Sequence, residues 1–190
     1  DKAEALYYFP LFRTWFGLAG FCKLPWNDVV PADNARQPEA HKVPEHVQNY
    51  VDLFTATTGW KITKEELLVQ SARVYNFQRV FNIRMGKGLR EHDRAPYRSM
   101  GPVTREEYES RADRYDRQIV EEMGLDPSGM NLEEKMAAHR RWREERYRKL
   151  TDAVYLRRGW TPNGVPTLER LKELGLDALP EVVDVVRQHL

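Results

Sequence analysis

Helix boundaries are the feature that most constrains how this 190-residue chain can fold. Thr63, Thr104 and Asn131 each precede an apolar-periodic segment, where a Thr or Asn oxygen can accept a hydrogen bond from a free amide of the first helical turn. Glycines such as Gly59 and Gly124 follow these segments, and glycine readily adopts the left-handed conformation that ends a helix. Strand patterns are nearly missing from the sequence. It therefore predicts an all-α fold, an irregular helical domain of about six helices.

Apolar residues that recur every three or four positions place the six helices. Two of them begin with a capping box, in which Thr63 pairs with Glu66 and Thr104 with Glu107. The expected helices run from Pro44 to Thr57, from Thr63 to Gly86, from Thr104 to Gly124, from Asn131 to Arg157, from Thr167 to Gly175 and from Pro180 to Leu190. The second helix carries as its apolar positions Leu67, Val74, Phe77 and Phe81.

Residues 1–43 are predicted to form a long Pro-rich N-terminal arm, before a C-terminal helical domain over residues 44–190. The aromatic-rich residues 1–16 fit two structures. One is a helix broken at Pro10, since proline lacks the amide that a helix interior requires, and the other is a buried extended segment. Four prolines within residues 23–44 predict a long ordered loop there.

The charge balance argues against several classes of function. Thirty Lys and Arg residues against 29 Asp and Glu residues give a net charge of +1, which disfavours a dedicated nucleic-acid binder or a binder of anionic membranes. No apolar run approaches the ~18 residues of a membrane-spanning helix, and the N-terminus shows no signal-peptide pattern. Because a single cysteine cannot form an internal disulfide, a cytoplasmic location is expected.

Cys22, the only cysteine, has three interpretations. A lone cysteine is most often a small buried apolar residue. A nucleophilic thiolate would need a histidine base in space, and none of the five histidines is near in sequence. A metal site would need further ligands, and the chain has no second cysteine. Gly17 and Gly20 precede the sulfur, and their missing side chains would let another group approach the backbone closely.

Three other stretches could carry chemistry, and each also has a plainer structural interpretation. Residues 139–149 interleave basic and aromatic side chains, as nucleic-acid-binding helices do, but the glutamates among them favour a solvated helix face. The loop from Arg90 to Arg94 could hold a metal or a phosphate, or could be a salt-bridged turn. Residues 157–166 fit a helix end followed by a rigid turn at Asn163 and Gly164.

Four stretches stand in a fixed order: TTGWKITKEELL, ARVYNFQRVFNIRMG, GLREHDRAPYR and AVYLRRGWTPNGVPTLERLKELGL. In this order they resemble the C-terminal region of the aldehyde ferredoxin oxidoreductase family of tungsten enzymes, and the resemblance covers about residues 17–176. The segment from Glu107 to Arg148 and the stretch CKLPWND resemble the branch that includes the tungsten subunit of the ATP-independent benzoyl-CoA reductases.

The family carries an Asp-x-x-Gly-Leu-Cys motif, whose cysteine is the last of four thiolate ligands of a 4Fe-4S cluster beside a bis-pterin tungsten cofactor. GLAGFC is similar to this motif, which implies that Cys22 is the fourth cluster ligand and that Gly20, Phe21 and Lys23 contact the cofactors. Gly17 stands where the family has Asp, so the acidic pterin contact is absent or supplied differently. The other three cysteines and most of the site for tungsten (or molybdenum) and its bis-pterin would lie outside this chain.

The resemblance implies an oxidoreductase that is incomplete and inactive as this chain alone. Such an enzyme would oxidise aldehydes with ferredoxin as acceptor, or reduce an aromatic acyl-CoA. Its partners would be the N-terminal pterin-binding region and ferredoxin or an iron–sulfur electron-transfer subunit. The arginines between Arg90 and Arg98 would suit an acidic partner or a CoA phosphate. The alternative is a non-catalytic helical interaction domain with a buried structural cysteine.

Overall fold

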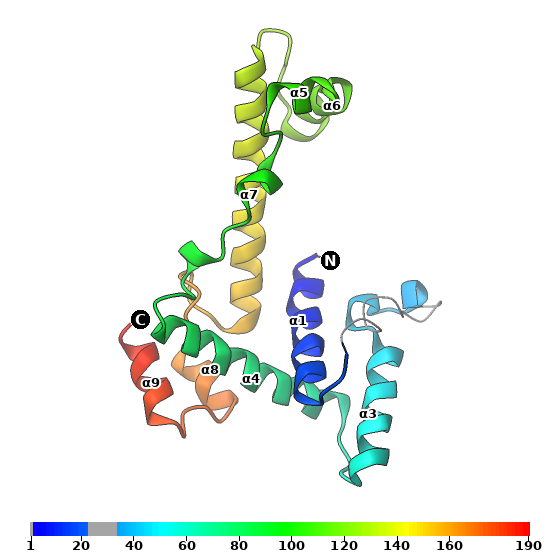
Figure 1. Cartoon of the computed structure of the whole chain (residues 1–190), viewed down its shortest axis with the longest axis vertical. Helices are drawn as coiled ribbons and strands as arrows, with labels where there is room; N and C mark the ends of the chain where they lie inside the picture. Colours follow the sequence, from blue (N-terminus) through cyan, green and yellow to red (C-terminus); the bar gives the residue numbers. More distant parts are fainter. Residues whose placement is uncertain (1, 23–33) are drawn as a thin grey trace. The chain divides into compact units, whose positions relative to one another are not determined.

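The computed structural model describes residues 2–22 and 34–190, which form helices and connecting loops (Figure 1). Within these residues the one extended pairing is an isolated bridge between Trp160 and Pro166. The eight α-helices of the described residues are α1 (Lys2–Leu18), α3 (Pro44–Thr58), α4 (Lys64–Arg84), α5 (Arg105–Glu109), α6 (Ala112–Met123), α7 (Leu132–Arg158), α8 (Leu168–Glu173) and α9 (Pro180–Arg187). The all-α prediction is confirmed. None of the helices described is long and apolar enough to cross a membrane.

The chain forms two compact units. The first comprises Asp1–His92 and Ala153–Leu190, and the second comprises Asp93–Asp152. α7 begins in the second unit and ends in the first. The predicted division into an arm over residues 1–43 and a helical domain over residues 44–190 stays a prediction, but α1 packs against α4 inside the first unit.

Part of the loop expected over residues 23–44 is helical. Residues 23–33 lie outside the described part of the chain. After them come two short 3-10 helices, Asn34–Arg36 and Ala40–Lys42. The side chain of Asn34 donates to the carbonyl of Ala40 at 3.0 Å, which ties the two turns together. The described end of this segment is therefore ordered, as expected, and leads directly into Pro44 at the start of α3.

α1 is a continuous helix that contains Pro10, so both expectations for residues 1–16 were wrong. Pro10 has no amide hydrogen to donate to the carbonyl of Leu6, four residues earlier. The guanidinium of Arg158 donates to this carbonyl instead, with 2.9 Å between Nη2 and oxygen. The hydroxyl of Thr14 donates to the Pro10 carbonyl at 2.8 Å. A side chain distant in sequence thus satisfies the acceptor that proline leaves open.

Two apolar clusters form the core of the first unit, and α1 contributes to both. The first cluster contains Leu11, Ala72, Val80, Ile83, Val165, Leu171, Leu174, Leu176, Val182 and Val186. The second contains Phe12, Trp15, Phe16, Val43, Val47, Val51, Ile62 and Leu67. Because α1 is buried in two clusters at once, packing holds the helix whose C-terminal end leads to Cys22.

α4 begins with the predicted capping box. Thr63 Oγ1 accepts from the Glu66 amide at 3.1 Å, and the Glu66 carboxylate accepts from the Thr63 amide at 2.8 Å. Its apolar positions do not all turn inward, however. Leu67 is buried, whereas Phe77 and Phe81 are 43% and 54% exposed. The apolar positions read from the sequence therefore do not form a single buried face.

The buried face of α4 includes three polar side chains, Ser71, Asn76 and Arg79, and the last two find partners within the first unit. Asn76 Oδ1 accepts from the indole Nε1 of Trp160 at 2.7 Å, and Arg79 Nε donates to the carbonyl of Gly164 at 2.9 Å. A buried polar group that has a hydrogen-bond partner costs far less free energy than one without. The buried face of α4 is therefore not predicted by a pattern that counts only apolar residues.

The helix expected over residues 104–124 is divided into α5 and α6 in the second unit. At the division the hydroxyl of Ser110 donates to the carbonyl of Glu107 at 2.9 Å. Its expected capping box is only half formed. Thr104 Oγ1 accepts from the Glu107 amide, but the Glu107 carboxylate accepts from the amide of Val103. Local side-chain bonds of this kind compete with the helical backbone pattern.

Candidate functional site

Cys22 follows directly on a helix-ending motif at the C-terminus of α1. Gly20 has a left-handed φ of +76°. The Phe21 amide donates to the Phe16 carbonyl at 2.9 Å, and the Gly20 amide donates to the Gly17 carbonyl at 3.4 Å. These two bonds form a Schellman motif, which satisfies the last carbonyls of a helix. The backbone conformation therefore favours glycine at position 20, because any residue with a Cβ is strained at this φ.

Three aromatic neighbours hold the ring of Phe21. Its centroid lies 5.9 Å from that of Trp15, 6.0 Å from that of Phe16 and 6.2 Å from that of Tyr50. Aromatic pairs at such distances contribute about 0.5–1.5 kcal/mol each beyond the burial of area. The residue before the sulfur is therefore anchored in the apolar core of the first unit.

Tyr50 is itself fixed by His46, which precedes it by one turn on α3. The phenol oxygen lies 2.9 Å from His46 Nε2, and the two rings are perpendicular with centroids 4.8 Å apart. Burial lowers the pKa of the His46 imidazole and raises the pKa of the Tyr50 phenol. Both shifts favour the neutral forms at neutral pH. The support beneath Phe21 therefore carries no charge.

The sulfur side of this motif is open. Cys22 is exposed, so the interpretation as a buried structural cysteine is wrong for the chain as described. Among residues 2–22 and 34–190, no heavy atom from another part of the chain lies within 4 Å of the place that a Cβ would take on Gly17 or on Gly20. Because the Cys22 thiol is exposed and Gly17 and Gly20 have no side chains, a group from outside the chain has room to approach this segment closely. Lys23, also assigned to cofactor contact, lies outside the described residues.

The described residues offer no complete metal site. Within them no group of three or more His, Cys, Asp or Glu side chains is placed to hold a metal ion. A cluster with four thiolate ligands fits at Cys22 only if its other ligands come from another part of the enzyme. The geometry described can supply one thiolate on a rigid, uncharged support.

Comparison with known proteins identifies the family. The sequence model described as "Aldehyde ferredoxin oxidoreductase, domains 2 & 3" matches residues 1–176. The chain belongs to the aldehyde ferredoxin oxidoreductase family. A tungsten-containing aldehyde ferredoxin oxidoreductase of Pyrococcus abyssi is 27% identical over 129 residues, which cover 68% of this chain and 16% of the relative. The enzyme of the same name from Pyrococcus furiosus is 27% identical over 128 residues, which cover 67% of this chain and 16% of the relative.

This family member thus spans about 16% of the length of the curated relatives that it matches. No solved structure matches it. The resemblance to the family is confirmed. The assignment to the benzoyl-CoA reductase branch, and the cofactor roles of Cys22, Gly20, Phe21 and Lys23, stay predictions.

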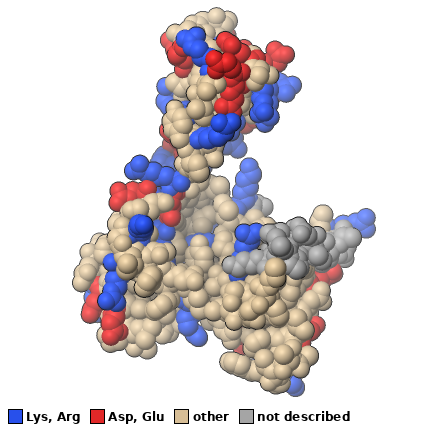
Figure 2. Space-filling view, in the orientation of Figure 1, with Lys and Arg blue, Asp and Glu red and all other residues tan. Residues whose placement is uncertain are grey.

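Residues 139–149 of this family member lie on α7 and have the pairing expected of a solvated helix face. Arg146 pairs with Glu122 of α6 at 3.2 Å, and Arg148 pairs with Glu145 at 2.8 Å. His139 is fully buried, so it is not part of the charged surface. On the face seen in Figure 2, Lys and Arg side chains lie interspersed with Asp and Glu side chains.

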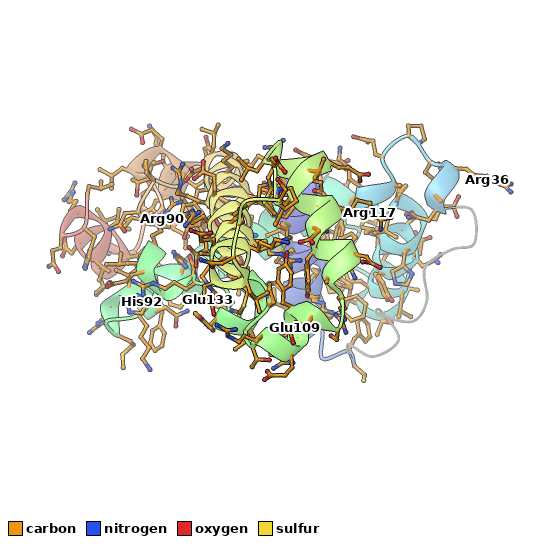
Figure 3. All side chains as sticks on the ribbon, turned by 90° about the horizontal axis from the view of Figure 1, so that it is seen from above. Arg36, Arg90, His92, Glu109, Arg117 and Glu133 are labelled. Carbon is orange, nitrogen blue, oxygen red and sulfur yellow. The ribbon has the colours of Figure 1, made fainter. Side chains whose placement is uncertain are left out.

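The loop that follows α4 is held by backbone carbonyls. Arg90 Nη1 donates to the carbonyl of Pro162 at 2.8 Å, and the Arg90 amide donates to the carbonyl of Asn163 at 3.0 Å. The guanidinium also lies 5.7 Å from the ring centroid of Tyr155. Arg90 is labelled in Figure 3. In the first unit, Arg90 therefore fastens this loop to the predicted rigid turn, and its proposed contact with a CoA phosphate stays a prediction.

A pair of buried arginines lies next to Trp160 and was not predicted from the sequence. The guanidinium carbons of Arg79 and Arg158 lie 4.7 Å and 5.2 Å from the Trp160 ring centroid, and that of Arg158 lies 4.2 Å from the ring of Tyr75. Arg79 and Arg158 are only 9% and 5% exposed. Burial lowers the pKa of the Arg158 guanidinium. The stretches YNFQR and RRGW contain these residues, but neither pattern by itself indicates that an arginine is buried.

Proposed function

We propose that this chain is the C-terminal part of a tungsten–pterin oxidoreductase, in which Cys22 supplies one thiolate to a 4Fe-4S cluster. The observation that carries the proposal is the exposed sulfur directly after the Schellman motif of α1, in a chain whose family is known. An exposed cysteine alone does not indicate a ligand. Here, however, Gly20 and Phe21 are held by hydrogen bonds and aromatic contacts, whereas the thiol of Cys22 is exposed.

In this proposal the residues of the chain position one ligand. Gly20 ends α1 at a defined place, and the ring of Phe21 packs against Trp15, Phe16 and Tyr50, which fixes the backbone directly before Cys22. Cys22 then holds one iron as a thiolate. When bound, the cluster supplies one-electron transfer between the tungsten–pterin centre and an external acceptor. The bare backbones of Gly17 and Gly20 leave room for the pterin.

Reaction and partners are carried over from the relatives. Their name states that they are tungsten-containing and act on aldehydes with ferredoxin. We therefore assign aldehyde oxidation, with a low-potential ferredoxin as electron acceptor, to the enzyme that contains this chain. Molybdenum in place of tungsten is distinguished by metal analysis of the purified enzyme, and reduction of an aromatic acyl-CoA by activity assays with both substrates on the same preparation. The cytoplasmic location stays a prediction.

The test uses the complete enzyme purified natively, with Cys22→Ala and a control at the same helix end, Leu18→Ser. Leu18 is 53% exposed, so its replacement changes the surface without removing the sulfur. We expect Cys22→Ala to lose iron and acid-labile sulfide and the EPR signal of the reduced cluster, whereas Leu18→Ser keeps all three. Tungsten is measured in parallel. Unchanged iron content and an unchanged EPR spectrum in Cys22→Ala would refute the assignment of Cys22.

A further inference from the structure

An apolar patch lies on the exposed side of α4. Phe77, Phe81 and Met85 follow one another at intervals of four residues from the last turns of α4 to its C-cap, and they are 43%, 54% and 63% exposed. Residues four apart on a helix are neighbours on one face. Single exposed apolar side chains are ordinary, but a continuous group of two phenyl rings and a thioether marks an interaction surface. We call these three residues the α4 patch.

The other sides of α4 are already occupied within the first unit. α4 packs against α1, α3 and α9. Its inward face buries Val80 and Ile83 in the core. The helix therefore carries apolar side chains on two sides: Val80 and Ile83 are buried within the first unit, whereas the α4 patch is exposed. A helix that is apolar on both sides is stable when both sides are covered.

The size of the relatives indicates what covers the patch. This chain accounts for about 16% of the curated relatives that it matches, and the family description names domains 2 and 3. Most of the polypeptide of these relatives therefore lies outside the part that this chain matches, and that region is the occupant we consider for the patch. The patch also belongs to the unit that carries Cys22, and α1 and α4 share one core through Leu11.

We propose that the α4 patch is buried against an apolar surface of the remainder of the enzyme. This rests on the proposed function only in requiring that the remainder be present. The patch has no carboxylate or cationic member, so the matching surface is apolar and the contact is little affected by salt. Burying two phenyl rings and one methionine in this way would hold the unit that carries Cys22 in place next to the cofactor region.

The first experiment measures the accessibility of the patch in the complete enzyme. Hydroxyl-radical footprinting with mass spectrometry reports on Phe77, Phe81 and Met85, and Met100, which is 8% exposed, serves as an internal buried reference. We expect Met85 to be oxidised on the order of tenfold more slowly than in the urea-unfolded enzyme, close to the rate of Met100. Oxidation of Met85 at the unfolded rate would overturn the proposal.

The second experiment identifies the occupant. An amine-reactive cross-linker is applied to the complete enzyme, and the partners of Lys87, which is exposed and two residues beyond Met85, are sequenced. Cross-links to segments outside these 190 residues support the proposal. Cross-links confined to residues 93–152, or to Lys87 of a second copy of this chain, would mean that another surface covers the patch and would overturn it.

Variants complete the test. Phe81→Asp is expected to raise the oxidation rate of Met85 in the complete enzyme at least as much as Phe77→Asp, because Phe81 is the more exposed of the two phenyl rings. Val120→Asp is the matched control, since Val120 is 52% exposed on α6 in the second unit. Circular dichroism checks that each variant keeps its helices. Equal oxidation rates of Met85 in Phe81→Asp and Val120→Asp would contradict the proposal.

Metal analysis of the same preparation separates the two proposals. A protected patch in an enzyme without iron or tungsten would refute the proposed function and leave the α4 patch intact as an interface. A loaded enzyme in which Met85 is freely oxidised would refute the interface and leave the proposed function standing.

Discussion

The bond between Arg158 and α1 makes a quantitative prediction about Pro10. Arg158 Nη2 donates to the Leu6 carbonyl at 2.9 Å because the residue four positions on is a proline. In a Pro10→Ala variant the new amide of residue 10 can donate to that carbonyl. Arg158→Met should therefore destabilise the Pro10→Ala protein less than it destabilises the parent protein.

The size of this coupling can be worked from its parts. A hydrogen bond to a charged group contributes about 1.5–3 kcal/mol, and an ordinary helical bond contributes about 0.5–1.5 kcal/mol. Arg158→Met also has two effects of opposite sign on stability. It destabilises the protein by removing the cation–π contact with Tyr75, and it stabilises the protein by removing a buried charge. Both of these occur in either background and cancel in a double-mutant cycle. We expect a coupling free energy of about 1–2 kcal/mol.

The assay is equilibrium urea unfolding of the parent, the two single variants and the double variant, followed by circular dichroism. Arg157→Met provides the matched control, because Arg157 pairs with Glu4 at the same end of α1 and leaves the Leu6 carbonyl untouched. No coupling with Pro10→Ala is expected for Arg157→Met. Free energies of unfolding for Arg158→Met and Pro10→Ala that add within about 0.5 kcal/mol would refute the reasoning.

Three further predictions concern single positions. Gly20→Ala should cost about 1–2 kcal/mol in urea unfolding, because its φ of +76° strains any residue with a Cβ; an unchanged midpoint would contradict this. Thr63→Ala should cost about 1 kcal/mol in the same assay through loss of the α4 cap, and Thr63→Ser should restore most of it. Burial lowers the pKa of His139 in the folded protein; the unfolded chain therefore binds more protons as pH falls below about 6.5, and stability should decline there. His139→Gln cannot titrate, so its unfolding free energy should depend less steeply on pH between about 6.5 and 5, and equal slopes would refute a role for His139.

Much of the helical architecture is predictable from local chemistry. The capping box at Thr63 forms as expected, and Gly59 and Gly124 end α3 and α6 with left-handed φ values of +75° and +67°. These features depend on residues a few positions apart, so the sequence pattern contains all the information they require. The family motif likewise singles out Cys22, although its role as a ligand stays a prediction. That Cys22 directly follows the end of a helix is seen only in the structure.

Two departures from prediction come from residues that are distant in sequence, whereas the division between α5 and α6 accompanies local bonds such as that from Ser110 to Glu107. Pro10 is tolerated inside α1 only because Arg158 supplies the missing donor. Asn76 and Arg79 turn inward on α4 only because Trp160 and Gly164 bond to them. The cost of burying a polar group depends on whether a partner is present, and a linear pattern does not show the partner.

The sequence by itself determined the helical class, most helix ends, the family and the position of the single thiol. The tertiary structure decided which face of α4 is buried, that α1 continues through its proline, and that the sulfur of Cys22 is open while Phe21 beside it is anchored. The difference between what the sequence determines and what the tertiary structure decides has one physical reason. Caps and turns are satisfied by neighbours along the chain, whereas burial and exposure depend on contacts that only the folded chain brings together.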